Sequence, residues 1–224
     1  MRIAVFGLTV SSSWGNGHAT LWRGLLRALA QRGCHSTFFE RDVPYYAATR
    51  DLHAGDGWDL ALYSSWSAAL PAARAALRNA DVAMVTSYCP DAAAASELIA
   101  EHKRLFRVFY DLDTPVTLGR LERGERVEYI PRDGLSQFDL VLSFTGGRAL
   151  DELRSALGAR RTAPLYGSVV HAAVTEGPGT CALISGNASA SSACTRPMRA
   201  AGSSAASARP LSAVVNVVSS PASA

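Results

Sequence analysis

The stretch that decides the fold reads MRIAVFGLTVSSSWGNGHATLWRGLLRALAQRG, from Met1 to Gly33. Its short apolar run 2–7 predicts a strand that is covered on both faces. Leucines at helical spacing then predict a helix that Gly33 ends, namely Leu21, Leu25, Leu26 and Leu29. The loop between strand and helix presents backbone N–H groups at the positive end of the helix, where a phosphate, a carboxylate or a sugar hydroxyl can bind. The unit therefore predicts a fold class but no particular ligand.

The same alternation of strand and helix continues to about Val170. Further strands are predicted at 36–40, 59–63, 81–87, 105–110, 138–144 and 162–166. Helices are predicted at 68–79 and at 91–102, with Asp91 as N-cap, and a third helix ends at Gly158. Such a chain forms parallel βαβ units. We expect an α/β, Rossmann-like fold with a mainly parallel sheet and helices on both faces.

The composition changes sharply after Glu176. Residues 177–224 contain no Asp, Glu, Lys or aromatic residue, and Ala (12) and Ser (11) fill 23 of these 48 positions. Such a segment buries too little apolar surface to offset its ordering entropy. It is either a natural disordered tail or the product of a shifted reading frame, since one lysine against 21 arginines indicates GC-rich coding DNA. We expect one domain over 1–172 and an irregular Ala/Ser-rich tail over 173–224.

Composition and charge exclude several classes of protein. The chain has 224 residues, of which 48% are hydrophobic, which is enough for one good core, and a formal net charge of only +3, which does not favour nucleic acid. The cysteines lie far apart without ligand-like spacing: Cys34, Cys89, Cys181 and Cys194. We therefore expect no metal site and reduced thiols in a cytoplasmic protein. No signal peptide and no membrane span are predicted.

His18 is the first candidate for chemistry, because it stands where the first loop meets the first helix. A histidine can take a proton from an alcohol if a carboxylate orients it. Asp111 and Asp113 follow the strand 105–110 and would lie at the same edge of the sheet as His18. The alternatives are a solvent-exposed polar residue at a helix start for His18, and a helix cap or an ion pair for the two aspartates.

Glycine-containing loops at the same edge are the candidates for substrate binding. The first is Gly15-Asn16-Gly17, before His18, and the second is Gly146-Gly147, which is equally compatible with a tight turn. Thr114 is a further candidate, in the turn that Pro115 makes rigid. The chain has no GxxxxGK[ST] loop and no clean GxGxxG, so no nucleotide cofactor is predicted. Three aromatic residues are expected to pack together, although a strand-end aromatic can also stack on a sugar: Trp58, Tyr63 and Trp66.

Several of these segments, in this order, resemble the start of a bacterial glycosyltransferase. They are Trp14-Gly-Asn-Gly-His18, Phe109-Tyr-Asp-Leu-Asp-Thr-Pro-Val-Thr117, Phe138-Asp-Leu-Val-Leu-Ser-Phe-Thr-Gly-Gly147 and Leu157-Gly-Ala-Arg160 leading to Pro164-Leu-Tyr166. Over roughly 1–172 the chain is similar to the N-terminal domain of two-Rossmann (GT-B) enzymes, in particular the CgeB-like, spore-maturation-type group. The resemblance implies one half of a GT-B fold that binds a sugar acceptor, a small molecule or a glycan. It also implies that a nucleotide-sugar binds only if a second domain is supplied, because nothing in 177–224 provides a donor site.

Two functions therefore remain open from the sequence. The first is the acceptor-binding half of a glycosyltransferase, truncated or frameshifted after about residue 175 and inactive without a donor domain. The second is a non-catalytic Rossmann-like module that binds a ligand or a partner. An intact donor domain encoded downstream in another frame would favour the first, and a fragment without affinity for sugars or nucleotides would favour the second.

Overall fold

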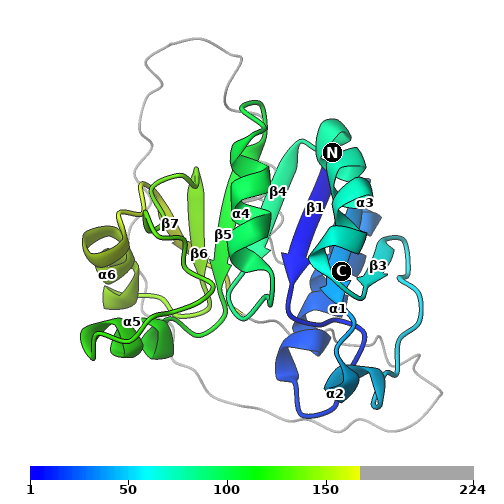
Figure 1. Cartoon of the computed structure of the whole chain (residues 1–224), viewed down its shortest axis with the longest axis horizontal. Helices are drawn as coiled ribbons and strands as arrows, with labels where there is room; N and C mark the ends of the chain where they lie inside the picture. The colour runs from blue at the N-terminus through cyan, green and yellow to red at the C-terminus, as the bar shows by residue number, and fades with distance from the viewer. Residues whose placement is uncertain (167–224) are drawn as a thin grey trace, which may run out of the picture.

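The computed structural model describes residues 1–166, which form one seven-stranded sheet with the order β3-β2-β1-β4-β5-β6-β7 (Figure 1). Every neighbouring pair of strands is parallel. The strands are β1 (Arg2–Gly7), β2 (His35–Arg41), β3 (Asp59–Tyr63), β4 (Val82–Thr86), β5 (Phe106–Asp111), β6 (Leu140–Ser143) and β7 (Thr162–Pro164). The predicted boundary at 172/173 and the predicted tail lie outside the described residues.

The order of the strands reverses beside β1. From β1 the chain first builds outward to β2 and β3, and then returns to add β4 on the other side of β1. Val5 in β1 consequently stands between Phe38 of β2 and Met84 of β4. Open parallel sheets bind ligands at such a reversal, beyond the carboxyl ends of the strands. The carboxyl ends of β1 and β5 lie at this same edge with only β4 between them.

The helices cover both faces of the sheet, which confirms the predicted Rossmann-like α/β class. They are α1 (Gly17–Gln31), α2 (Pro44–Ala47), α3 (Trp66–Asn79), α4 (Ala92–Ala100), α5 (Thr114–Glu122) and α6 (Arg148–Leu157). Figure 1 shows α3 and α4 on the near face of the sheet and α1 behind it. The longest of these helices, α1, has 15 residues, and none within 1–166 has the length and apolarity that a membrane span requires.

Each face of the sheet carries its own apolar core. On one face, Trp22, Leu26 and Leu29 of α1 pack with Val5 and Phe38 of the sheet. The core of the other face draws on α3, α4 and α6, and its buried members include Phe6, Phe39, Ala73, Leu77, Ile99, Phe109 and Leu153. Alternate side chains of each central strand thus point into different cores, which is why these strands are apolar throughout.

The aromatic group near β3 is divided between the two cores. Trp58 is buried on the α1 face, whereas Tyr63 and Trp66 belong to the opposite core, with ring centroids 6.4 Å apart. The packing role is confirmed, but the expectation of a single group is wrong. Trp58 precedes β3 in a loop, so the alternation of a strand does not set its direction.

Two helices were not expected from the sequence. The Asp113-Thr114-Pro115 segment indicates a rigid turn, but Pro115 stands in the first turn of α5, where its missing N–H needs no partner. The short helix α2 likewise has Pro44 at its start. In both cases proline begins a helix where the sequence indicated only a break.

Helix α4 begins after Asp91, as predicted, but the carboxylate of Asp91 does not cap it. Its Oδ2 accepts a hydrogen bond from the Tyr63 hydroxyl at 3.0 Å, and its Oδ1 contacts the Arg41 guanidinium at 3.2 Å. Asp91 therefore ties β2 and β3 to the start of α4. The predicted position is correct, and the predicted bond to the helix backbone is absent from this part of the structure.

Candidate functional site

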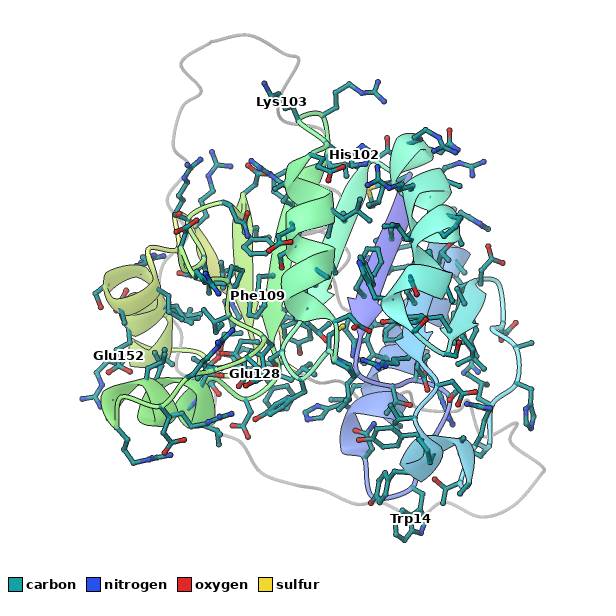
Figure 2. All side chains as sticks on the ribbon, viewed as in Figure 1. Trp14, His102, Lys103, Phe109, Glu128 and Glu152 are labelled. Carbon is teal, nitrogen blue, oxygen red and sulfur yellow. The ribbon has the colours of Figure 1, made fainter. Side chains whose placement is uncertain are left out.

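The loops after β1, β5 and β6 meet at the carboxyl edge of the sheet. His18, in the first turn of α1, lies against Phe144, which follows β6, with ring centroids 6.4 Å apart and the rings nearly perpendicular. Asp113 follows β5 and precedes α5. Figure 2 shows Trp14 beyond this edge, whereas His102 and Lys103 lie at the opposite edge of the sheet. The predicted catalytic residues thus come from separate elements that end at one place.

His18 is partly buried and electrostatically coupled to Asp113. Burial lowers the pKa of His18, and the charge of Asp113 raises it in the opposite direction. The net shift is downward, so the ring is neutral at neutral pH and can accept a proton. Its Nδ1 is buried without a hydrogen-bond partner in the described structure. Nε2 is the nitrogen that remains for a ligand.

The carboxylate of Asp113 is available for a ligand. Its backbone oxygen accepts the Thr117 N–H at 3.1 Å, but no described residue hydrogen-bonds its side chain. The charge of Asp113 influences the pKa of two ring-bearing side chains, His18 and Tyr88. No direct bond joins Asp113 to His18 in residues 1–166.

Asp111 lies beneath this surface and is completely buried. Its Oδ1 accepts hydrogen bonds from the Asp113 N–H at 3.2 Å and from the Thr117 hydroxyl at 3.0 Å. The Thr117 hydroxyl is also 2.9 Å from that of Tyr129. Oδ2 of Asp111 is buried without a partner among residues 1–166, and burial raises the pKa of this carboxyl. Asp111 thus supports the turn into α5, while Asp113 is the aspartate that acts on His18.

The loop before His18 is held by its own cap and by an acidic residue that the sequence did not single out. Asn16 is buried and caps α1, with its Oδ1 accepting the His18 N–H at 3.1 Å. Glu40, at the end of β2, is fully buried and accepts four hydrogen bonds from Thr9, Val10 and Ser11 at 2.5–2.9 Å. In a dinucleotide-binding unit, an acid after the second strand binds the ribose. Here Glu40 is occupied by the protein's own loop.

The glycines of the predicted substrate loops differ in the space around them. Gly15 has a φ of +62° and lies near the Tyr45 hydroxyl, whereas Gly17, at the start of α1, has open space on its side-chain face. Gly147 is also open, with a φ of +65°, and precedes α6. The face of Gly146 is covered by the Tyr166 hydroxyl. Backbone can therefore approach a ligand at Gly17 and Gly147, and at Gly146 only if Tyr166 moves.

Thr114 does not present a free hydroxyl. It is fully buried, and its Oγ1 lies 2.7 Å from the Ser143 Oγ at the end of β6. Ser143 in turn donates to the Thr145 carbonyl at 2.6 Å. This chain of bonds fixes the start of α5 against β6. Thr114 thus positions the loops around the site, and a ligand reaches it only after the loops rearrange.

Tyr88 is a candidate that the sequence did not indicate. It is the one residue other than glycine with a positive φ (62°) within 1–166, in the loop after β4 at the strand-order reversal. An L side chain is strained in this region, and such strain gathers at functional sites. Its ring packs against that of Tyr129, with centroids 5.0 Å apart. Nothing in the sequence distinguishes a tyrosine that will adopt this backbone conformation.

No protein-family model matches this chain, and a search of curated proteins also found no match. The described residues contain no group of three or more His, Cys, Asp or Glu side chains placed to hold a metal ion. The function must therefore be argued from the site itself: a neutral histidine, a free carboxylate and a strained tyrosine around the carboxyl edge of a parallel sheet.

Proposed function

We propose that this chain is the acceptor-binding half of a GT-B glycosyltransferase of the CgeB-like group, which moves a sugar from a nucleotide-sugar to an acceptor hydroxyl. The observation that carries the proposal is the pairing of a neutral, partly buried His18 with the free Asp113 at the carboxyl edge of the sheet. The segments on which the family resemblance rests also end at this edge, since 14–18, 109–117 and 138–147 each follow or contain a strand end there.

In this proposal His18 is the general base. Nε2 takes the proton of the acceptor hydroxyl as its oxygen attacks the sugar carbon, and the negative charge of Asp113 stabilises the imidazolium that forms. The departing diphosphate needs positive groups held in place, and those belong to a donor domain that is no part of residues 1–166. The buried thiols of Cys34 and Cys89 support a cytoplasmic location for the enzyme.

The experiment begins with the DNA beyond codon 170, because a donor domain encoded there in another frame would favour the proposal. The chain as it stands is expected to transfer no sugar from a panel of UDP-, GDP- and dTDP-sugars. The frame-restored protein is expected to transfer one of them. Transfer or donor hydrolysis by the 224-residue chain, clearly above a His18→Ala control, would show that the site lies wholly within it.

In the restored enzyme, His18→Ala is expected to lower kcat roughly 100-fold or more, with a smaller effect on KM, because a base acts in the transition state. His102→Ala is the matched control, since His102 lies at the opposite edge of the sheet (Figure 2). If kcat is unchanged in His18→Ala, His18 is not the base.

A non-catalytic ligand-binding module is the second candidate. It is favoured by one observation, that neither aspartate hydrogen-bonds His18 in the described residues. The two candidates differ in what happens to a bound alcohol. Binding without transfer in the frame-restored protein would select the module, and transfer that depends on His18 would select the enzyme.

A further inference from the structure

A shallow pocket opens to solvent beside His18, on the α1 face of the sheet. One wall is a single stripe of α1, with residues at i, i+3, i+4 and i+7: His18, Leu21, Trp22 and Leu25. The opposite wall comes from the ends of β5 and β7: Tyr110, Leu112, Leu165 and Tyr166.

The interior of this pocket is apolar. Leu21 and Leu25 are only partly buried because the pocket lies against them. The Tyr110 hydroxyl is already used, since it donates to the Leu165 carbonyl at 2.8 Å. The ring of Tyr110 packs edge-on against that of Trp22, with centroids 5.9 Å apart. The floor therefore offers mainly aromatic and aliphatic carbon.

Two polar groups lie at the rim. They are the ring of His18 and the hydroxyl of Tyr166, a residue that is 62% exposed. A sugar ring in the pocket would leave most of its hydroxyls without protein partners, and burying an unpaired hydroxyl is unfavourable. A planar apolar ring has no hydrogen bonds to lose in the pocket, and it gains contact with Trp22 and the leucines.

We propose that this pocket binds an alcohol or phenol whose body is an apolar ring system, with its hydroxyl at His18. This inference rests on the proposed function, because it names the class of acceptor for the same site. The ring lies between α1 and the ends of β5 and β7, and its hydroxyl emerges at the rim beside Nε2. Specificity for the ring comes from Leu21, Leu25 and Trp22, and the position of the hydroxyl comes from His18.

The test measures binding to the full 224-residue chain by calorimetry, with 2-naphthol as the apolar ring alcohol and methyl β-glucoside as the sugar. We expect 2-naphthol to bind at least about tenfold more tightly than the glucoside. Leu25→Phe fills the pocket and is expected to weaken 2-naphthol at least about tenfold. Thr20→Phe is the matched control, since Thr20 is an exposed residue of α1 outside the pocket. The affinity of this variant for 2-naphthol should differ from that of the unchanged chain by less than about twofold.

Leu21→Phe is a second filling variant, in case Leu25→Phe does not fold, and shift changes in the amide NMR spectrum locate the ligand on α1. Equal or tighter binding of the glucoside, or undiminished 2-naphthol binding in a folded filling variant, would overturn the inference. The proposed function is tested by a different outcome. If 2-naphthol binds here but the frame-restored protein transfers no sugar, the proposed ligand class is supported and the glycosyltransferase function is not. If sugars are glycosylated and 2-naphthol does not bind, the glycosyltransferase function is supported and the proposed ligand class is not.

Discussion

Glu40 holds the loop between β1 and α1 through one carboxylate. Both of its oxygens are buried, and each accepts two hydrogen bonds from residues 9–11. The donors on Val10 and Ser11 are backbone N–H groups, which have no other partner once the carboxylate is removed. Since the loop leads directly into Asn16 and His18, Glu40 positions the site without touching it.

Glu40→Ala is therefore expected to lower the free energy of unfolding by about 3 kcal/mol or more, because it leaves buried donors unpaired. Urea denaturation at neutral pH measures the change. Glu97→Ala is the matched control: Glu97 is exposed on α4, and its loss should cost less than about 0.5 kcal/mol. Equal losses in the two variants would show that the network contributes nothing to stability.

Asp111 gives a pH-dependent prediction. Burial raises the pKa of its carboxyl above the ordinary value of 3.8. Between the unfolded and the folded pKa the native state holds more protons, so the stabilisation present below pH 3.8 is lost as the pH rises through the folded pKa. Asn cannot titrate. Asp111→Asn should therefore gain stability relative to the natural chain over an interval of rising pH that begins at about pH 4.

Urea denaturation at several pH values in this interval checks the sign. Asp133→Asn is the control, because Asp133 is exposed and its side chain makes no bond in the described structure, so its effect should stay within about 0.5 kcal/mol. A relative stability of Asp111→Asn that falls as the pH rises would contradict the raised pKa.

At the level of elements, the sequence predicted helix α1 but not the division of its apolar residues. Leu26 and Leu29 enter the core, whereas Leu21 and Leu25 border a pocket. Both pairs satisfy the same helical spacing, so only the position of β5 and β7 opposite the helix separates them. The C-terminal ends of two helices were easier to predict, because glycine readily adopts the positive φ that often follows a helix. Gly33 and Gly158 have φ angles of 74° and 70°.

Gly158 ends α6 in the left-handed conformation, with its N–H bonded to the Arg154 carbonyl at 3.1 Å. Gly158→Ala is expected to lower the free energy of unfolding by about 1 kcal/mol, because a Cβ is strained at this φ. Gly17→Ala is the comparison, since Gly17 has open space around it and no positive φ, and it should be neutral within about 0.5 kcal/mol. Thermal and urea denaturation measure the change in unfolding free energy for both variants.

At the scale of the whole molecule, the alternating pattern was enough to predict the parallel α/β fold, and each predicted strand overlaps an observed one. The sequence could not supply the strand order, because the pairing partners of β1 lie 33 residues (Arg2 to His35) and 79 residues (Ile3 to Val82) further along the chain, and no local signal chooses between its edges. The contacts of the site follow from that order. Glu40 was not singled out for this reason, and Tyr88 was not because no sequence signal indicates its positive φ. His18 and Asp113 were predicted from strand ends alone, and their catalytic role stays a prediction.

The composition of 177–224 leads to a prediction for the intact chain. A segment that is rich in Ala and Ser and has no aromatic or acidic residue is expected to be cut rapidly by a nonspecific protease, leaving a resistant core that ends near residue 172. Mass spectrometry of the digest locates the end. A tail that survives as long as the core would contradict the assignment of residues 173–224 to an irregular segment.

The position of β1 between β2 and β4 also affects how the protein folds during synthesis. Among the strands of residues 1–166, β1 leaves the ribosome first, and its partner on one edge is complete once Arg41 has followed. The other edge waits for β4, which ends at Thr86. At a synthesis rate of roughly 5–20 residues per second, that wait lasts about 2 to 9 seconds. For this interval the nascent protein carries an open apolar edge in what will become its middle, so translation speed between codons 41 and 86 sets its exposure to misassembly.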